Sequence, residues 1–260
     1  MIAKQLVAAN ELAWRAWTAP AATAEVSRWL LARGLDPVGI RAAGFQVGAA
    51  PASWDSLTDL LARHRVPNSV ALAAGLVRAS STGRHYDGFR DRMVLPVREV
   101  TDGALAGFTA RRLGEDPRAP KYLNSPASPA FRKGRLLFGA WEARSVMAAS
   151  RESVEGLVVC EGPFDVLAVA STGRWAAVAP CGTALTLDQA GWIVALARAF
   201  DVGVQLAFDA DPPGQAASDR AWDLLVDAGV PALRLADLPE GSDPADLSPS
   251  QLDTALTLHR

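Results

Sequence analysis

Cysteine and histidine are scarce in this 260-residue chain, and their scarcity limits the chemistry available to it. The two cysteines, Cys160 and Cys181, cannot by themselves build a disulfide framework or a structural zinc site. Both lie in apolar, strand-like stretches, which favours reduced and packed thiols. The three histidines are scattered at His64, His85 and His259. The chain therefore offers too few cysteine and histidine residues to suggest a zinc enzyme or a histidine-based hydrolase, and no zinc is expected.

Long apolar runs are lacking as well. No stretch approaches the roughly 20 apolar residues that are needed to span a bilayer. The N-terminal segment, MIAKQLVAANELAWRAW, carries Glu11 and Arg15 within a helical pattern and lacks the apolar core and cleavage site of a signal peptide. The sequence therefore predicts a cytoplasmic protein with no membrane partner.

The net charge of −2 hides an uneven distribution of charged residues. Residues 84–135 hold eleven basic and six acidic side chains, which gives this segment about +5 and leaves about −7 for the remainder. Such asymmetry suggests a basic face that meets phosphates, although an ordinary solvated surface also produces a margin of this size. The basic residues are Arg84, Arg90, Arg92, Arg98, Arg111, Arg112, Arg118, Lys121, Arg132, Lys133 and Arg135.

The residue pattern divides the chain into two predicted domains, 1–153 and 154–260. In the first domain, apolar residues recur at helical spacing over about the first 80 residues. It continues with two strands within 92–112 around an Asp-Gly turn, a loop-like segment at 114–134 and a helix within 136–150. The first domain is therefore expected to be mixed α+β.

Apolar strands alternate with helices in the second predicted domain, which favours an α/β fold with a four-stranded parallel sheet between helices. Ligands of such sheets gather at the carboxyl ends of the strands. The expected strands are 157–160, 175–180, 202–208 and 231–236, and the expected helices are 163–172, 187–200, 212–229 and a last one from about 244.

Acidic residues lie at three of these strand ends. Asp211 and Asp243 each precede a proline, so helix capping alone explains them, and Asp246 fits a variant capping box with Asp243. Capping does not explain Glu161 or Asp209, which directly follow apolar strand residues. Clustered carboxylates repel one another unless a cation such as Mg²⁺ relieves the repulsion, which favours a shared metal site over pure capping. The three clusters are Glu161 with Asp165, Asp209 with Asp211, and Asp243 with Asp246.

Several linked motifs resemble a known family. VCEGPFDVLAVA, PCGTALT, LAFDADPPGQAA and EGSDPADL have the order, spacing and strand context of the TOPRIM domain, which bacterial DnaG-type primases, topoisomerases and several nucleases share. Upstream, YDGFRDRMVLPVRE, GFTARRLG, PKYLNSP and FRKGRLLFGAWEA resemble the N-terminal part of the DnaG-type polymerase core. The resemblance covers nearly the whole chain, and it implies a TOPRIM domain preceded by a mixed α+β subdomain.

The resemblance also implies roles for the acidic residues. Glu161 matches the glutamate that acts in acid/base chemistry or metal organisation, and Asp209 and Asp211 are implied to be catalytic beside it. Together with Asp243, these residues are implied to hold Mg²⁺ or Mn²⁺. Asp165 is implied to support the site. The family often reads Asp-Pro-Asp where this chain reads Asp243-Pro244-Ala245-Asp246, so Asp246 is expected only to support the site.

Basic residues of the +5 segment are implied to line a groove for nucleic acid and nucleotide. Arg111, Lys121 and Lys133 match the family's basic residues there, and Asn124 and Ser125 lie in a loop of the same groove. Lysine and arginine would neutralise the phosphates of the template and of the incoming triphosphate.

The sequence therefore predicts a primase-like core that makes short RNA primers on single-stranded DNA from ribonucleoside triphosphates. No Cys/His cluster for the family's zinc-binding domain is present, and the helicase-binding part is expected to be absent. A helicase, relaxase or zinc-finger protein acting in trans is thus an expected partner. Two alternatives stay open: a TOPRIM nuclease, and a non-catalytic factor that binds single-stranded nucleic acid. A topoisomerase would need a tyrosine nucleophile, and both tyrosines, Tyr86 and Tyr122, lie in primase-like motifs.

Overall fold

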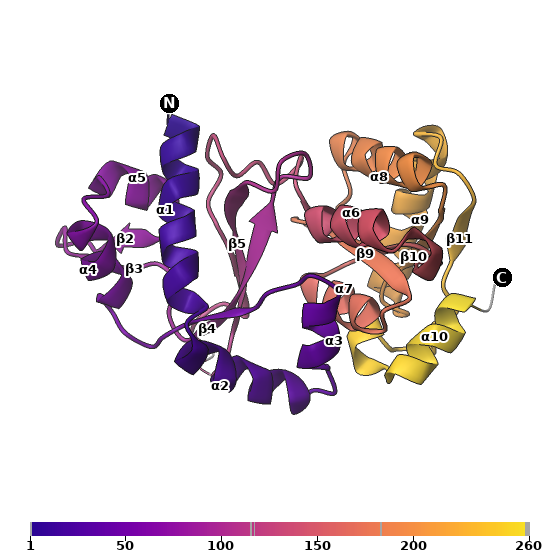
Figure 1. Ribbon diagram of the computed structural model, residues 1–260, viewed down its shortest axis with the longest axis horizontal. Coiled ribbons are helices and arrows are strands. Elements are labelled where there is room, and N and C mark those ends of the chain that lie inside the picture. The colour runs from indigo at the N-terminus through magenta and orange to yellow at the C-terminus, as the bar shows by residue number, and fades with distance from the viewer. Residues whose placement is uncertain (1, 115, 117, 183, 258–260) are drawn as a thin grey trace. The chain divides into compact units, whose positions relative to one another are not determined.

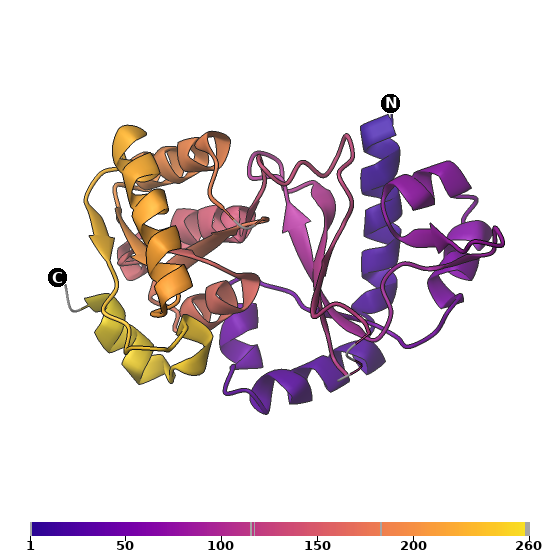
Figure 2. The same cartoon turned by 180° about the vertical axis from the view of Figure 1, so that it is seen from behind.

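The computed structural model describes residues 2–114, 116, 118–182 and 184–257 (Figures 1 and 2). These residues form two compact units, each with its own sheet and core. The predicted domain boundary after residue 153 stays a prediction. Among the described residues, the first unit takes in those within 1–29, 46–99 and 103–132, and the second takes in those within 30–45, 100–102 and 133–260.

The first unit is built on an antiparallel sheet of four strands in the order β1-β4-β5-β6. The side-chain amide of Asn10 donates to the carbonyls of Leu105 and Ala106, which fastens helix α1 to β5. The elements are α1 (Ile2–Trp17), β1 (Gly48–Ala50), α4 (Ser56–Arg63), α5 (Asn68–Ala73), β2 (Val77–Ala79), β3 (His85–Asp87), β4 (Arg92–Arg98), β5 (Leu105–Arg112) and β6 (Tyr122–Asn124), with α2 (Pro20–Leu31) leading into the second unit.

Aromatic rings fill the core of the first unit. The Trp17 ring packs edge-on against Phe108 with centroids 5.0 Å apart, and Phe89 packs edge-on against both. All three side chains are almost fully buried. Large aromatic side chains bury much apolar area each, so these three rings anchor the sheet to α1.

The second unit contains a five-stranded sheet in the order β11-β10-β8-β9-β7. Four strands are parallel, as predicted, and β7 pairs antiparallel with β9 at one edge. The strands are β7 (Leu137–Phe138), β8 (Gly156–Cys160), β9 (Trp175–Pro180), β10 (Gly203–Ala207) and β11 (Leu233–Leu235). The helices are α3 (Pro37–Ala42), α6 (Ala140–Ala149), η1 (Arg151–Ser153), α7 (Pro163–Ser171), α8 (Leu187–Phe200), α9 (Pro212–Asp227), η2 (Pro244–Asp246) and α10 (Pro249–Thr257).

Helices cover both faces of the sheet in the second unit. Leu157 and Val159 of β8 share a buried cluster with apolar residues of α6, α8 and α9. Neighbouring strand residues point to opposite faces, so Val158 and Cys160 point the other way. Helix α7, which contacts α3 and α10, covers that second face. No helix within the described ranges is both long and apolar enough to cross a bilayer.

Three predicted elements were wrong in detail. The segment 136–150, predicted as one helix, contains strand β7 before α6, because Gly139 turns the chain with a φ of 82°. The loop-like segment 114–134 contains β6, which forms only because residues 122–124 pair with β5. The last helix begins at Pro249 instead of about residue 244, since Asp243 caps only the short 3₁₀ turn η2.

Strands β8 and β10 lie at the switch point of the sheet, where the direction in which successive strands are added reverses. The chain leaves β8 through α7 to reach β9 on one side, and it leaves β10 through α9 to reach β11 on the other. The two strands are parallel neighbours, with Cys160 paired to Ala207 at their carboxyl ends. Ligands of open α/β sheets bind in the crevice at such a switch point.

Candidate active site at the carboxyl ends of the central strands

Two carboxylates stand directly at this switch point. Glu161 follows the last residue of β8, and Asp209 follows β10 by two residues. The backbone N–H of Asp209 donates to Oε1 of Glu161 at 3.3 Å, which links the ends of the two strands. Both side chains are half-buried. Residues that the sequence places 48 apart therefore meet at one edge of the sheet.

The neighbouring aspartates act as caps as well as charges. Asp211 accepts a hydrogen bond from the backbone N–H of Gly214 at the start of α9, at 2.8 Å. Asp243 accepts from the N–H of Asp246 at 2.9 Å and begins η2. Both capping interpretations were correct, so the presence of these aspartates in the sequence does not by itself indicate catalysis.

Asp165 is the most deeply buried acid of the group. It lies in the first turn of α7, where its Oδ2 accepts from the backbone N–H of Gly162 at 3.0 Å. Burial, and then the charges of Asp243, Asp209 and Glu161, raise the pKa of Asp165 to about 8. The carboxyl group therefore takes up a proton near neutral pH unless a cation lies nearby.

The electrostatics of the remaining acids shows that they form one cluster. Burial raises the pKa of Asp209 to about 6, with further contributions from Glu161, Asp243, Asp211 and Asp246 in that order. Burial also raises the pKa of Glu161, a shift that the hydrogen bond from Asp209 opposes. The structure thus brings all six predicted acids together in the second unit, and their individual roles stay predictions.

The carboxylate oxygens of these acids are suitable ligands for a hard divalent cation, although the side chains do not converge on one point. Across the described ranges, no three His, Cys, Asp or Glu side chains already converge as metal ligands. Backbone N–H groups engage Glu161, Asp211 and Asp243 instead. The raised pKa of Asp209 reflects first its burial and then the negative charge of the neighbouring acids. An all-oxygen donor set with excess negative charge suits Mg²⁺ or Mn²⁺.

A cavity of about 350 Å³ adjoins Glu161. Arg220 of α9 lines this cavity and gives it a positively charged side. Burial raises the pKa of Glu161, and the charge of Arg220 acts in the opposite direction and lowers it. Arg220 was missed in the sequence, because only the geometry of α9 brings it beside a residue 59 positions earlier. Apolar side chains form the rest of the wall, among them Pro180, Leu185 and Phe208.

The predicted basic residues separate into two places. Arg111 of β5 places its guanidinium 5.0 Å from the Trp29 ring centroid and 5.6 Å from that of Tyr122, whose hydroxyl lies 3.3 Å from Nη1. The Lys121 ammonium lies 5.5 Å from the same Tyr122 ring centroid. Arg111 and Lys121 are thus gathered around Tyr122, a residue of the PKYLNSP motif to which the sequence analysis gave no binding role.

Three other predicted residues have separate positions. Asn124 ends β6 in the first unit, and the buried Ser125 beside it accepts a hydrogen bond from the N–H of Phe108. Lys133 belongs to the second unit, where its carbonyl accepts from the side chain of Gln189. The roles of Asn124 and Lys133 in binding stay predictions.

The raised pKa values imply a particular pH dependence of stability in the metal-free protein. Asp165 has a folded pKa of about 8 against an ordinary 3.8, so the folded state binds more protons than the unfolded state between these values. The free energy of unfolding therefore falls as pH rises through this window, by about 1.4 kcal/mol per unit for one proton. Urea unfolding in EDTA from about pH 5 to about pH 7 measures this slope.

Two comparisons check the assignment of this slope. The Asp165→Asn variant should lower the slope, most clearly above about pH 6 where Asp209 is already mostly ionised, because asparagine keeps an acceptor for the Gly162 N–H and does not titrate. Added Mg²⁺ should stabilise the protein most at the alkaline end, because a cation binds the ionised carboxylates of the folded state. A stability that stays level or rises with pH in EDTA would contradict the proposed charge cluster.

The fold of the second unit is that of a Toprim-type domain. A family model described as Toprim-like matches residues 158–248, and one described as the N-terminal domain of the DNA primase catalytic core matches residues 16–144. A DNA primase of Halalkalibacterium halodurans is 40% identical over 203 residues, covering 78% of this chain and 32% of the relative.

Solved structures agree with the family models over almost the whole chain. The RNA polymerase domain of Mycobacterium tuberculosis primase DnaG is 30% identical, with a TM-score of 0.81 over 98% of this chain and 84% of that one. A DnaG primase catalytic domain bound to single-stranded DNA is also 30% identical, with a TM-score of 0.79 over 98% and 79%. The chain therefore belongs to the family of DnaG-type primase catalytic cores, as its motifs indicated. It spans about a third of the length of the curated primases that it matches.

Proposed function

We propose that this chain synthesises short RNA primers on single-stranded DNA by metal-dependent nucleotidyl transfer. The observation that carries the proposal is the cluster of Glu161, Asp209, Asp211 and Asp243 at the switch point of a sheet that belongs to this family. Open α/β sheets bind their ligands at such a point, and carboxylates are the ligands that a phosphoryl-transferring metal needs there.

The residues of the second unit have distinct parts in this proposal. Glu161, Asp209, Asp211 and Asp243 would hold Mg²⁺ or Mn²⁺, which supplies a clamp for the attacking and leaving oxygens of in-line displacement. Asp165 positions the loop after β8 through its hydrogen bond with Gly162. Because Gly162 directly follows Glu161, this hydrogen bond also sets the position of Glu161 in the site.

Basic residues supply the contacts to phosphate. Arg111 and Lys121 surround Tyr122 in the first unit, and Lys133 and Arg220 lie in the second. The solved DnaG primase catalytic domain bound to single-stranded DNA supports the same kind of template for this chain. Ribonucleoside triphosphates are the proposed second substrate. A helicase, relaxase or zinc-finger protein is the proposed partner for loading onto the template.

One assay tests the proposal against the two alternatives. The chain is mixed with single-stranded DNA, labelled ribonucleotides and Mg²⁺ or Mn²⁺, and the products are separated on a denaturing gel. Short labelled RNA that depends on template and metal is the expected result. Shortened DNA would instead indicate a Toprim nuclease, and DNA binding without either product would indicate an accessory factor; both outcomes contradict the proposal.

A further inference from the structure

The start of helix α8 holds a short basic turn that lies far earlier in the chain. This turn consists of Lys133, Gly134 and Arg135, all three exposed to solvent, and we call it the Lys133 turn. It leads through Leu136 into β7. The turn and α8 both belong to the second unit, so the contacts between them lie within one compact unit.

Gln189 makes the central contacts to the Lys133 turn. Gln189 is only 1% exposed, and its amide nitrogen donates to the carbonyl oxygens of Lys133 at 2.9 Å and of Leu136 at 2.7 Å. Its amide oxygen accepts from the backbone N–H of Thr186 at 3.0 Å. A glutamine side chain carries two N–H donors, and both are used here. Gln189 therefore binds the carbonyl at the beginning of the turn and the one directly after its end.

Two neighbours of Gln189 add contacts to the same turn. The hydroxyl of Thr186 donates to the carbonyl oxygen of Gly134 at 2.5 Å. Asp188 forms an ion pair with Arg135 at 3.4 Å, but both side chains are more than half exposed, so this pair contributes little. The hydrogen bonds of Gln189 and Thr186 therefore set the position of the turn.

Helix capping does not account for these contacts. The capping box needs only the Thr186 hydroxyl to accept from the Gln189 N–H and the Gln189 amide oxygen to accept from the Thr186 N–H. A glutamate at this position would complete the same box, because a carboxylate also accepts. Of these two residue types, only glutamine supplies donors to the carbonyls of Lys133 and Leu136. The residue type at position 189 thus fits the turn as well as the helix.

The Lys133 turn lies near the carboxyl edge of the parallel sheet. Cys181 directly follows β9, and burial raises the pKa of its thiol to about 12, while the charge of Lys133 lowers it. The Lys133 ammonium therefore lies near this end of β9. Leu185 lines the cavity beside Glu161, and Thr186 is the next residue of the chain. Lys133 and the acids thus lie at the same edge, at which ligands of such sheets bind.

The charge of Lys133 is available to a ligand at this edge. No ion pair of Lys133 is found across the described ranges, and its ammonium belongs to an exposed residue. A lysine ammonium is a compact charge on a flexible four-carbon stem, so only the backbone beneath it can restrict where the charge lies. The hydrogen bonds from α8 supply that restriction.

We propose that Gln189, with Thr186, is a positioning residue that holds Lys133 where it contacts the triphosphate of the incoming ribonucleotide. A fixed cation at this place stabilises the bound triphosphate in the ground state and in the transition state alike, so it lowers KM and leaves kcat nearly unchanged. The inference rests on the proposed function, which supplies the ribonucleoside triphosphate as substrate and Lys133 as one of its contacts.

The test measures the dissociation constant of a ribonucleoside triphosphate that carries a fluorescent N-methylanthraniloyl group, in Mg²⁺ and without template. Lys133→Ala should weaken binding about tenfold, because a hydrogen bond between charged groups is lost. Gln189→Met keeps the length of the side chain and removes both donors, and it should weaken binding by about threefold to tenfold. In primer synthesis, KM for the ribonucleotide should rise by the same factor, with kcat within about twofold.

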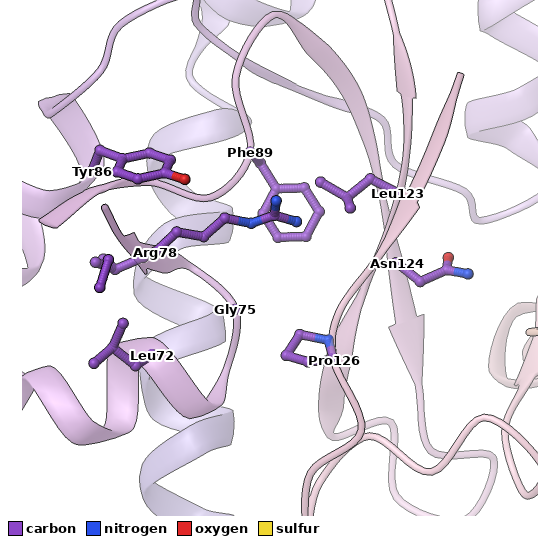
Figure 3. Close-up of a pocket in the computed structure, with 10 residues that line it drawn as sticks. Leu72, Gly75, Arg78, Tyr86, Phe89, Leu123, Asn124 and Pro126 are labelled. Atoms are coloured by element: carbon purple, nitrogen blue, oxygen red, sulfur yellow. The ribbon is translucent and has the colours of Figure 1, made fainter. Parts of the chain in front are cut away.

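A double variant separates positioning from a general loss of structure. Because Gln189 acts through Lys133, Gln189→Met combined with Lys133→Ala should match Lys133→Ala alone within about twofold. Asn124→Ala gives the comparison, since Asn124 belongs to the first unit, where Figure 3 shows it beside Leu123 and Pro126 at a cavity of about 400 Å³. The effects of Gln189→Met and Asn124→Ala should multiply. Effects of Gln189→Met and Lys133→Ala that multiply would overturn the inference.

Gln205→Met is the matched control for the loss of a buried amide. Gln205 lies in β10, is 6% exposed, and donates to the carbonyl oxygen of Leu256 in α10 at 2.8 Å. Its replacement should lower the urea midpoint, as in Gln189→Met, but leave nucleotide binding within about twofold of the parent chain. An equal loss of nucleotide binding in Gln205→Met would overturn the inference, as would parental binding in a folded Gln189→Met.

A second pair of variants keeps the inference testable if Gln189→Met unfolds. Thr186→Val keeps the shape of the side chain and removes the hydroxyl that donates to Gly134, whereas Thr186→Ser keeps this hydroxyl. Thr186→Val should weaken nucleotide binding about threefold, and Thr186→Ser should bind like the parent chain. Parental binding in Thr186→Val would overturn the inference. So would a loss confined to the affinity for single-stranded DNA, which would assign the turn to the template.

The binding measurement also distinguishes this inference from the proposed function. A chain whose nucleotide binding depends on Gln189 and Lys133, but which makes no RNA, leaves the inference standing and removes the proposed function. A chain that makes RNA while Gln189→Met binds nucleotide like the parent does the opposite.

Discussion

Primer synthesis should fall by about a thousandfold or more when Glu161 is replaced by glutamine, while the fold and the binding of DNA persist. Glutamine retains an oxygen that can accept from the Asp209 N–H, so the link between the ends of β8 and β10 is kept. The substitution removes only the negative charge and the acid/base capacity at the switch point. Labelled RNA product per template, measured at saturating Mg²⁺, checks the loss.

Glu152→Gln is the matched control for this experiment. Glu152 lies in η1, outside the acidic cluster, and its side chain is exposed. The same chemical change there should leave synthesis within about twofold, because an exposed surface substitution has little effect. Substantial synthesis by Glu161→Gln, with unfolding curves that match the parent chain, would remove Glu161 from the catalytic set.

Gly214→Ala is expected to have the second-largest effect, through a residue that carries no functional group. A Cβ atom at Gly214 would lie 2.2 Å from the carbonyl oxygen and 2.9 Å from the Cβ of Asp209. Because that contact is with backbone, Asp209 or the start of α9 must move. Overpacking of this kind costs about 1–3 kcal/mol, and a displacement of a catalytic group by about 1 Å costs about a hundredfold in rate.

The measurement for this variant pairs primer synthesis with urea unfolding. Gly191→Ala is the control, since Gly191 lies in α8 and a Cβ there meets nothing within 4 Å. Alanine at an open helical position should stabilise the chain by about 0.5–1 kcal/mol and leave synthesis unchanged. Parental activity and stability in Gly214→Ala would show that Asp209 does not need its present position.

The parallel sheet of the second unit was predictable because local signals agree with the tertiary arrangement. The strand 175–180 and the helix 187–200 were predicted with their observed bounds. Thr186 and Gln189 form a capping box at the start of α8, so this helix start is determined by neighbours in sequence. Strands β6 and β7 could not be predicted, because two or three residues carry no periodicity and become strands only by pairing with distant partners.

The acids of the site were predictable for a different reason. Each follows a strand or begins a helix, and the carboxyl ends of parallel strands must meet at one edge. Sequence reasoning could not show that Asp165 is buried enough to raise its pKa to about 8, or that Arg220 lies beside Glu161. Those facts depend on how α7 and α9 pack, which local pattern does not determine.

The sequence by itself determined the family, the α/β character of the second unit and the identity of the acidic cluster around Glu161 and Asp209. It did so because strand–helix alternation and caps are local, and because the motifs keep a distinctive order. Only the tertiary structure decided which partners those residues meet: the Asp209 N–H on Glu161, the close approach of Gly214 to Asp209, and the stacking of Arg90 on Trp54. These contacts join residues through space, and the pairing of distant segments follows from packing and charge summed over the whole fold.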